Sequence, residues 1–556
     1  MRSGKWDDLD IRRVNILSIC SLNKIKLLVM LSTTLFLVLS SACQNSQPQA
    51  NFLLITLDTQ RADHIGAYNP EFDISPNIDM LAQKGILFEN CDSPIPITLP
   101  AHSVMFYSQM PHDLKIYNNG QALEQRSDRP SITKIFHEKG FATGAFISLG
   151  VLKDKFGLNE GFDVYDAYFP VGEYYISAEE INNKVFPWLE KIRDKKFFAW
   201  IHYSDPHSPY YPPDLPPEIK LYVNDTHIGD YHLNKRIHEI DCRLESGLNR
   251  IRFELQYDPS EIPVQSNPAF FDKLEFEDLS NETLLKYSLK SGLTRDDKDR
   301  IDINENVTFV EVLNPGEPCD GRIFLRGKMI RKKSVNRKYY RTEVEYMDRQ
   351  IGKLLEKLRE LQLFDKTHIL VVGDHGEGLG EYINYSGGDD FGHVNFLYKV
   401  YTHVPMIIYN PLGKLEAERR AEPVSLLDVA PTIMGIMGFD QLPHFQGRDL
   451  LKTKLEVDHS IFLQTHTPQA EKDIFAFMRY PWYLIFVPDL RSFELFDLEN
   501  DPSQENNIFN ESDIPEAVIN LQRELISKAR SVLEAKKTVK IDDKSEEMLR
   551  ALGYIK

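Results

Sequence analysis

The chain has 556 residues, 42% of them apolar and 11% aromatic, with 65 Lys and Arg against 83 Asp and Glu and a formal net charge of −18. This apolar content is sufficient to bury a core, which excludes an intrinsically disordered or collagen-like chain. The acidic balance argues against a protein that binds nucleic acid through a broad basic surface. The length suggests roughly two to four domains, or one large α/β unit with additions.

Residues 24–43, KIKLLVMLSTTLFLVLSSAC, have the layout of a secretion signal: two lysines, an apolar stretch and small residues before Cys43. The apolar stretch is too short to span a bilayer comfortably. Because a cysteine after small residues resembles a bacterial lipoprotein box, we interpret residues 1–43 as a signal and lipoprotein segment. We therefore expect an exported protein, periplasmic or on the outer surface of a bacterium, whose membrane contact is a lipid anchor on Cys43. Ordinary cleavage near Ala42 is the alternative.

Beyond this segment, short apolar runs of strand length each lead into acidic residues. NFLLITLD starts at residue 51, FFAWIHYSDPH at 197 and HILVVGDHGEG at 368. Continuous apolar runs are typical of strands buried on both faces of a parallel sheet. Between such runs, residues 343–361 show apolar side chains three and four positions apart, which indicates a helix. The alternation predicts a doubly wound α/β sheet with ligands at the carboxyl ends of its strands.

Residues 215–327 break this alternation. Residues 219–233 contain two short strands about an Asn-Asp turn, and residues 250–257 alternate apolar and polar side chains. We interpret 215–327 as an inserted antiparallel, β-sandwich-like module that divides a catalytic core into residues 44–214 and 328–460. A small C-terminal α+β subdomain and tail, 461–556, follow, with a hairpin or small sheet from Arg479 and a helix from Pro515 to about Ala535. Pro515 suits the first helical position.

Three cysteines lie beyond the signal segment: Cys91, Cys242 and Cys319. Their number is too small for a disulfide framework, and their spacing does not fit a zinc finger. A bridge between Cys242 and Cys319 stays open, because both fall in the inserted module.

Polar clusters follow three of the predicted strands: Asp58 with Arg61 and Asp63, Asp205 with His207, and Asp374 with His375. A single aspartate at a strand end is often only a helix cap. Three clusters in this order favour a site instead, because carboxylate and imidazole ligands that meet at one sheet edge suit a divalent cation. Ca, Mg, Mn and Zn all remain open.

The order and the amino-acid sequences of these segments resemble those of the sulfatase branch of the alkaline phosphatase superfamily. The matching stretches include NFLLITLDTQRADHIGAY, TLPAHSVMFYSQMPHDLKIYNNG, WIHYSDPHSPYYPP, VVGDHGEGLGE and the terminal ELFDLENDP. The resemblance covers residues 51–214 and 328–510. It implies an alkaline-phosphatase-like and sulfatase-like doubly wound mixed sheet flanked by helices.

The resemblance also implies roles for individual residues. Asp58, Asp374 and His375 match the family's metal ligands, and Thr98 stands at the nucleophile position, where its hydroxyl oxygen would be a fourth ligand to the metal. A second metal site is possible at Asp205, His207 and His393, and His207 and His393 are also candidates for catalytic roles. His102 and Asn119 are expected to contact the substrate. Arg61 and Asp63 are expected to brace the site. His202 is open between a site role and a structural one, and Thr59 replaces an aspartate that many sulfatases carry.

Thr98 departs from the family in the residue that matters most for chemistry. Sulfatases convert the Cys or Ser of a C-x-P-x-R motif to formylglycine, whereas this motif reads Thr98-Leu99-Pro100-Ala101-His102. Threonine cannot give the aldehyde, because its β carbon carries a methyl group. Cys91 lacks the motif's proline and arginine. No formylglycine is therefore expected.

These points predict an exported, metal-dependent, sulfatase-like hydrolase that cleaves a phosphate, phosphonate or sulfate ester through Thr98. Phosphorus is favoured, because a sulfothreonine would lack the aldehyde's easy route of release. The alternatives are a sulfuric ester hydrolase without formylglycine, a phosphoethanolamine-type transferase and a non-catalytic glycan-binding homologue. The expected partner is a small-molecule, glycan or lipid ester, and no nucleic acid.

Overall fold

The structure is a computed structural model that describes residues 50–124, 127–170, 173–213, 215–234, 236–264, 266–296, 300–412, 416–510, 515–536 and 543–551. The predicted export segment, 1–43, lies outside the described residues. Residues 51–556 form one compact unit. Within the described part of that unit, none of the helices combines the length and the apolar character needed to cross a bilayer.

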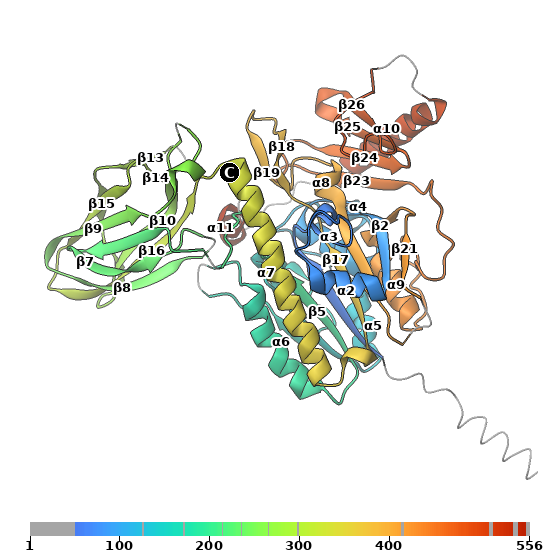
Figure 1. Cartoon of the computed structure of the whole chain (residues 1–556), viewed down its shortest axis with the longest axis horizontal. Helices are drawn as coiled ribbons and strands as arrows, with labels where there is room; N and C mark the ends of the chain where they lie inside the picture. Colours follow the sequence, from blue (N-terminus) through green and yellow to red (C-terminus); the bar gives the residue numbers. More distant parts are fainter. Residues whose placement is uncertain are drawn as a thin grey trace, which may run out of the picture. The chain divides into compact units, whose positions relative to one another are not determined.

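A nine-stranded mixed sheet forms the centre of this unit (Figure 1). The strand order is β21-β2-β20-β17-β1-β5-β3-β4, with β22 paired to β2. β1 runs parallel to both neighbours, so that Leu57 lies opposite Gly373 on β17 and Tyr203 on β5. The strands are β1 (Asn51–Leu57), β2 (Ile86–Asp92), β3 (Ala142–Phe146), β4 (Val164–Asp166), β5 (Phe197–Tyr203), β17 (Thr367–Gly373), β20 (His403–Tyr409), β21 (Glu418–Arg420) and β22 (Val424–Ser425).

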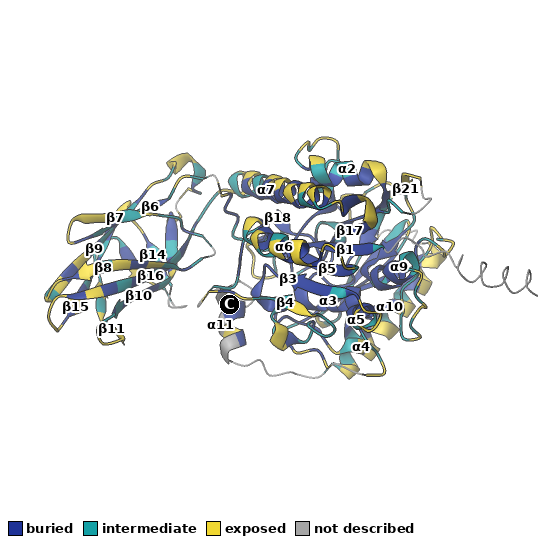
Figure 2. Cartoon of the chain, turned by 90° about the horizontal axis from the view of Figure 1, so that it is seen from below, coloured by how far each residue is buried: buried dark blue, intermediate teal, exposed yellow. Residues whose placement is uncertain are grey.

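Helices cover both faces of the sheet, which confirms the predicted α/β fold class. Figure 2 shows β1, β5 and β17, dark blue because they are buried, between α2 and α7 on one side and α3 and α5 on the other. The helices are α2 (Pro76–Lys84), α3 (Thr98–Tyr107), α4 (Pro111–Leu114), α5 (Ile132–Glu138), α6 (Ala178–Ile192), α7 (Lys333–Glu360), α8 (Lys399–Thr402), α9 (Val429–Ile436), α10 (Glu516–Ala535) and α11 (Asp543–Ala551).

Local capping explains where several of these helices begin. α6 starts at a capping box, in which the Ser177 side chain accepts from Glu180 N and Glu180 accepts from Ser177 N. α2 is capped from another helix: the Asp348 carboxylate of α7 accepts from Asn77 N at 3.1 Å and Ile78 N at 2.9 Å. The Asp348 side chain of α7 therefore fixes the start of α2. α7 itself begins at Lys333, ten residues before the predicted range 343–361.

The inserted segment folds into two antiparallel sheets that share one apolar core. Alternating inward side chains, such as Ile251, Phe253 and Leu255, supply this core, as the period of two predicts. Cys242 and Cys319 are free thiols, so the bridge left open by the sequence is not formed. The strands are β6 (Ile219–Val223), β7 (Thr226–Tyr231), β8 (His238–Leu244), β9 (Gly247–Leu255), β10 (Ala269–Asp278), β11 (Thr283–Leu284), β12 (Tyr287–Leu289), β13 (Leu293–Arg295), β14 (Ile301–Ile303), β15 (Val307–Asn314) and β16 (Cys319–Met329).

The C-terminal part forms a four-stranded antiparallel sheet against α10. This sheet begins before the predicted Arg479, with β23 (Ile461–Thr465) and β24 (Ile474–Arg479), and continues with β25 (Trp482–Val487) and β26 (Ser492–Asp497). Pro515 is the N-cap of α10 and not its first helical residue, which corrects the sequence prediction by one position. A separate two-stranded ribbon of β18 (Gly378–Ile383) and β19 (Asp389–Gly392) follows the central strand β17.

Candidate functional site

The carboxyl ends of β1 and β17 bring three predicted metal ligands together. Asp58 follows β1, and Asp374 and His375 follow β17, which pairs with β1 in parallel. One ligand atom of each residue lies within 4.8 Å of the other two, and all three residues are buried. Two carboxylates and one imidazole at this spacing fit a divalent cation.

The Asp374 carboxylate has one oxygen fixed by the backbone and one directed elsewhere. Its Oδ1 accepts from Thr59 N at 3.1 Å and from His375 N at 2.7 Å, whereas Oδ2 has no hydrogen-bond partner among the residues that the structure describes. Burial, together with the nearby charge of Asp58, raises the pKa of Asp374 well above its usual value. Two buried carboxylates side by side are costly unless a positive charge offsets them, so the pair itself fits a cation.

Thr59, which follows Asp58, has an unusual backbone conformation. Its φ is 56°, a left-handed value that a β-branched residue rarely adopts. The Tyr340 hydroxyl of α7 donates to Thr59 O at 2.8 Å, and Arg61 N donates to the same hydroxyl at 3.0 Å. These contacts hold the bend that aims Thr59 N at Asp374. Such strain, of order 1–3 kcal/mol, is typically found at functional sites.

Thr98 is the first residue of α3 and lies against the ligand cluster. Its Oγ1 is 3.2 Å from His375 Nε2, and Thr98 is fully buried. The other ring nitrogen of His375, Nδ1, is 3.0 Å from Gly376 O and donates its proton there, so Nε2 is the atom that faces Thr98. The amino end of a helix carries partial positive charge, which favours an anionic oxygen at this position.

Asn119 lies close to Thr98, because its side chain hydrogen-bonds to the backbone of Leu99, the next residue in the chain. Its Oδ1 accepts from Leu99 N at 2.8 Å, and its side chain is fully buried. The structure therefore places the predicted substrate contact Asn119 next to the predicted nucleophile.

His102 and His202 are both buried in the wall of the site. His102 Nδ1 lies 2.8 Å from Thr98 O and Nε2 3.1 Å from Thr56 Oγ1, so both nitrogens have partners within the protein. His202 Nδ1 lies 2.7 Å from Ser148 Oγ, and its Nε2 is 3.3 Å from an oxygen of Asp58. Burial lowers the pKa of His202 to about 3 and that of His102 well below its usual value, so both rings are neutral at pH 7.

The three residues predicted to bind a second metal, Asp205, His207 and His393, make different contacts in the structure. Asp205 Oδ1 accepts from Tyr175 OH and Ala178 N, both at 3.1 Å, and so contacts the start of α6. The ring of His393 lies 5.2 Å from that of His207 and 4.3 Å from that of His375, between centroids. Among the described residues, the only group of three or more ligand atoms is that of Asp58, Asp374 and His375.

Glu377 is a functional candidate that sequence reasoning missed. Its side chain is 0% exposed, with Oε2 accepting from His393 Nδ1 and Oε1 from Tyr210 OH, both at 2.7 Å. The carboxylate therefore fixes the orientation of the His393 ring through Nδ1, so that Nε2 is the ring nitrogen left for proton transfer. Burial lowers the pKa of His393 to about 4, although the charge of Asp58 opposes this shift. The signal in the sequence was the acidic residue two positions after His375.

Arg61 and Asp63 brace this arrangement from outside. Arg61 donates to both oxygens of Asp63, to Glu381 Oε1 at 2.7 Å and to the backbone oxygen of Glu377 at 3.1 Å. Burial opposes ionisation of Asp63, but the Arg61 charge outweighs it and holds the pKa of Asp63 well below its usual value. Arg61 thus links the segment after β1 to the backbone of Glu377.

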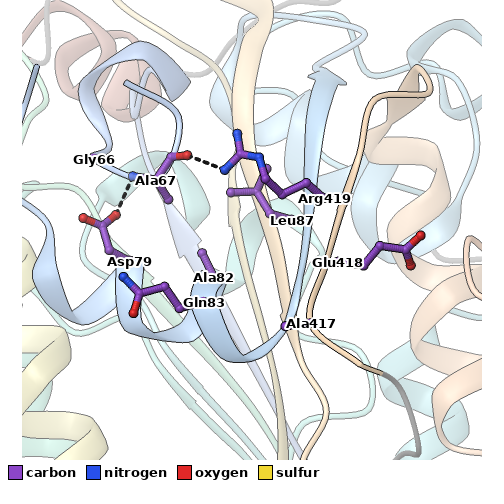
Figure 3. A pocket seen from close by; sticks show the side chains of 9 residues that line it. All are labelled: Gly66, Ala67, Asp79, Ala82, Gln83, Leu87, Ala417, Glu418 and Arg419. Atoms are coloured by element: carbon purple, nitrogen blue, oxygen red, sulfur yellow. Dashed lines mark hydrogen bonds between the residues drawn. The ribbon is translucent and has the colours of Figure 1, made fainter. Parts of the chain in front are cut away.

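A cavity of about 350 Å³ lies between α2 and the strand pair β2 and β21. Figure 3 shows Asp79 and Arg419 reaching the backbone of Ala67 from two sides, with hydrogen bonds of 2.7 and 2.8 Å. Neither the cluster nor Thr98 lines this cavity. Its charged groups hold the loop after β1 in place, and they add nothing to the chemistry at the cluster.

Comparisons with known proteins agree with this architecture. A family model described as "Sulfatase" matches residues 50–439, and one described as "N-sulphoglucosamine sulphohydrolase, C-terminal" matches residues 390–531. The chain is 25% identical to human iduronate 2-sulfatase, over 86% of this chain and 96% of that protein. It is 21% identical to N-acetylglucosamine-6-O-sulfatase of Bacteroides thetaiotaomicron, over 85% of this chain and 86% of that protein.

Solved structures share the fold at low sequence identity. The phosphonate monoester hydrolase of Agrobacterium radiobacter has a TM-score of 0.55 at 16% identity, and the likeness covers 87% of this chain and 95% of that one. A protein solved in complex with its substrate D-glucosamine-2-N,6-O-disulfate also has a TM-score of 0.55, at 17% identity, covering 89% of this chain and 99% of that one.

Proposed function

The chain belongs to the sulfatase family, whose members point to a hydrolase of sulfate or phosphate ester bonds, and we propose that it cleaves a phosphate or phosphonate ester through Thr98 with a divalent metal. The observation that carries this proposal is the position of Thr98 Oγ1, 3.2 Å from His375 in the cluster of Asp58, Asp374 and His375. A hydroxyl at the start of a helix and beside three hard ligands is the arrangement that a nucleophile needs.

Asp58, Asp374 and His375 are the residues that would hold the metal. A bound divalent cation supplies positive charge next to oxygens on which negative charge develops. The Asp374 oxygen without a hydrogen-bond partner supports this assignment, because a buried carboxylate oxygen is rarely left without one.

In the first step, deprotonated Thr98 Oγ1 attacks phosphorus. The bond from Oγ1 to phosphorus forms while the bond from phosphorus to the ester oxygen breaks, and the start of α3 favours the negative charge. His393 is neutral before the ester binds, because burial lowers its pKa to about 4, and it becomes protonated when the negative charge of the bound ester offsets that burial. Its Nε2 then gives a proton to the departing oxygen, which leaves as an alcohol. The products are a phosphothreonine and a neutral His393.

In the second step, water attacks the same phosphorus and His393 Nε2 accepts its proton. The bond from phosphorus to Thr98 Oγ1 breaks, which returns the threonine oxygen to its starting form and leaves His393 protonated for the next cycle. Glu377 stabilises that positive ring through the hydrogen bond to Nδ1, in the way that a carboxylate supports a catalytic histidine.

The substrate that the comparisons favour is a carbohydrate ester. The relatives named above include an iduronate sulfatase and an N-acetylglucosamine sulfatase, and one structural neighbour was solved with a disulfated glucosamine. These names also support a second candidate function, hydrolysis of a sulfate ester without formylglycine. Phosphorus remains our first choice, because a sulfothreonine offers no aldehyde through which to expel its group.

A substrate panel tests the proposal. The metal-loaded protein and its Thr98→Ala variant are assayed with 4-nitrophenyl phosphate, a bis(4-nitrophenyl) phosphodiester, a 4-nitrophenyl phosphonate and 4-nitrophenyl sulfate, and bound metal is measured by elemental analysis. We expect turnover of a phosphorus ester that the variant loses by at least about 10³-fold. Turnover of the sulfate alone would favour the second candidate. Equal activity in the variant would refute Thr98 as the nucleophile.

A further inference from the structure

Two buried side-chain amides, that of Asn119 next to Thr98 and that of Gln469 in contact with Asn119, each have an NH₂ group with no acceptor in the described part of the chain. Asn119 is 0% exposed and Gln469 is 6% exposed, and neither Asn119 Nδ2 nor Gln469 Nε2 has a hydrogen-bond partner among the described residues. Buried amide donors are nearly always paired, because leaving one unpaired costs its desolvation. Two such donors at one place indicate that an acceptor is supplied from outside the protein.

The backbone decides which end of each amide is the donor. Asn119 Oδ1 accepts from Leu99 N at 2.8 Å, and Gln469 Oε1 accepts from Asn119 N at 2.8 Å. A backbone N–H needs an oxygen opposite it, so neither amide can be turned round without losing this bond. The NH₂ groups are therefore held as donors, and they lie on two residues that contact each other directly.

Gln469 belongs to the loop between β23 and β24, which contacts one side of the site through Asn118 and Asn119. Thr467 O in this loop accepts from Asn118 Nδ2 at 3.1 Å, next to the contact between Gln469 and Asn119. The loop is thus attached to the segment that holds the backbone next to Thr98.

This loop and the last residue of β23 also contact the two residues that follow His393. Thr465 Oγ1 donates to Val394 O at 2.6 Å, and Glu471 N donates to Asn395 Oδ1 at 3.1 Å. The loop therefore connects the segment of the predicted nucleophile with the segment of His393. Gln469 lies in the chain between Thr465 and Glu471, the two residues that contact the His393 segment.

An internal network keeps this loop in one conformation. The Asp473 carboxylate contacts His466 Nδ1 at 2.9 Å, accepts from Thr467 N at 3.2 Å and pairs with Lys536 Nζ at 2.6 Å. A loop held at both ends and across its base keeps the Gln469 amide at a fixed position, which a preorganised binding group requires.

We propose that Gln469 Nε2 joins Asn119 Nδ2 in donating hydrogen bonds to the oxygens of the tetrahedral oxyanion, phosphate or sulfate, that is transferred at Thr98. The C-terminal subdomain then supplies part of the anion pocket. Neutral donors of this kind bind an anion without adding charge to a site that contains several histidines and that, on the proposed function, would hold a metal. The inference rests on the proposed function for the identity of the ligand.

The test measures binding of inorganic phosphate and of inorganic sulfate to the metal-loaded protein by titration calorimetry, so that it needs no turnover. Gln469→Glu keeps the acceptor for Asn119 N but replaces the donor with a carboxylate oxygen, whereas Gln469→Met removes both. Gln504→Glu is the matched control, because Gln504 Oε1 likewise accepts a backbone N–H, from Lys399 at 2.6 Å, and its Nε2 is buried without a partner.

We expect both Gln469 variants to raise the Kd of the bound oxyanion about tenfold to a hundredfold, with the control within about twofold of the unaltered protein. Normal binding by Gln469→Glu, with weak binding by Gln469→Met alone, would show that Gln469 only braces Asn119 and would overturn the proposal. A protein that binds neither anion would also overturn it.

These outcomes separate the inference from the proposed function. Ester turnover with unchanged anion binding in Gln469→Glu refutes the role of Gln469 and leaves the hydrolase intact. Anion binding that depends on Gln469, in a protein that turns over none of the esters, refutes the hydrolase and leaves the pocket. Thermal unfolding of each variant shows whether a loss reflects the fold, and the oxyanion's effect on Tm gives a second measure of binding.

Discussion

Replacing Glu377 by Gln changes one atom and one charge at the centre of the site. The Glu377 side chain is fully buried and its two oxygens accept from His393 Nδ1 and Tyr210 OH at 2.7 Å. The amide can still accept from Tyr210, but its NH₂ group then faces His393 Nδ1. The ring must turn its other nitrogen into the donor, so Nε2 can no longer accept a proton from water.

The size of the effect follows from the bond that is lost. A hydrogen bond to a charged group contributes about 1.5–3 kcal/mol, which corresponds to a fall of about 10- to 150-fold in kcat. We expect KM to change little, because the bond strengthens only when His393 becomes charged. Tyr210→Phe is the control: it removes a neutral donor and keeps the carboxylate beside His393, so a loss of only a few-fold is expected.

Stopped-flow release of 4-nitrophenolate distinguishes this role from a structural one. A 4-nitrophenolate leaves without a proton, so the first step survives in Glu377→Gln while the attack of water slows. The variant should therefore show a burst that approaches one nitrophenolate per active site, followed by slow turnover. Equal loss of the burst and of the steady rate, or an unchanged kcat, would refute the assignment of His393 and Glu377.

Thr98→Ser should retain measurable hydrolysis while Thr98→Ala loses it, because serine keeps the hydroxyl; steady-state rates check this. Asp58→Asn should lower the bound divalent metal from one equivalent toward none in elemental analysis, because one of the two carboxylates is lost. Asp473, whose pKa is lowered to about 2 by hydrogen bonds and charge from His466 and Lys536 that outweigh burial, stabilises the fold above its unfolded pKa near 4 and loses this as pH falls toward 2. Asp473→Asn should therefore cost about 1–2 kcal/mol in denaturant unfolding at pH 7, allowing for solvent screening, and nothing at pH 2. Cys43→Ser should move the protein from the membrane fraction to the soluble periplasm, as immunoblotting of cell fractions would show.

The sheet was predictable because its signals are local. Strands such as β1 and β17 are continuous apolar runs, and the aspartates that follow them mark one edge of a parallel pair, so Asp58 and Asp374 lie close together once β1 and β17 pair in parallel. The alternating strands of the inserted module are equally plain. The early start of α7 could not be predicted, because residues 333–342 are rich in charged and polar side chains and lack a clear apolar stripe.

The partnerships within the site were beyond the reach of the sequence. Glu377 is 16 residues from His393, and Gln469 is 350 residues from Asn119. Such pairs depend on how loops from separate elements pack, and a lone glutamate or glutamine carries no periodic signal. Asp205, whose place after a strand suggested a ligand, has one oxygen in contact with the start of α6, and its role as a metal ligand stays a prediction.

If Thr98 carries the transferred group during turnover, a quenched-turnover experiment should detect that group on its side chain. The metal-loaded protein is mixed with the phosphorus ester it turns over, acid-quenched within milliseconds, digested and sequenced by tandem mass spectrometry. We expect a phosphoryl or phosphonyl group on Thr98 that disappears as substrate is exhausted. Full turnover with Thr98 unmodified at every quench time, and undiminished in Thr98→Ala, would contradict this expectation.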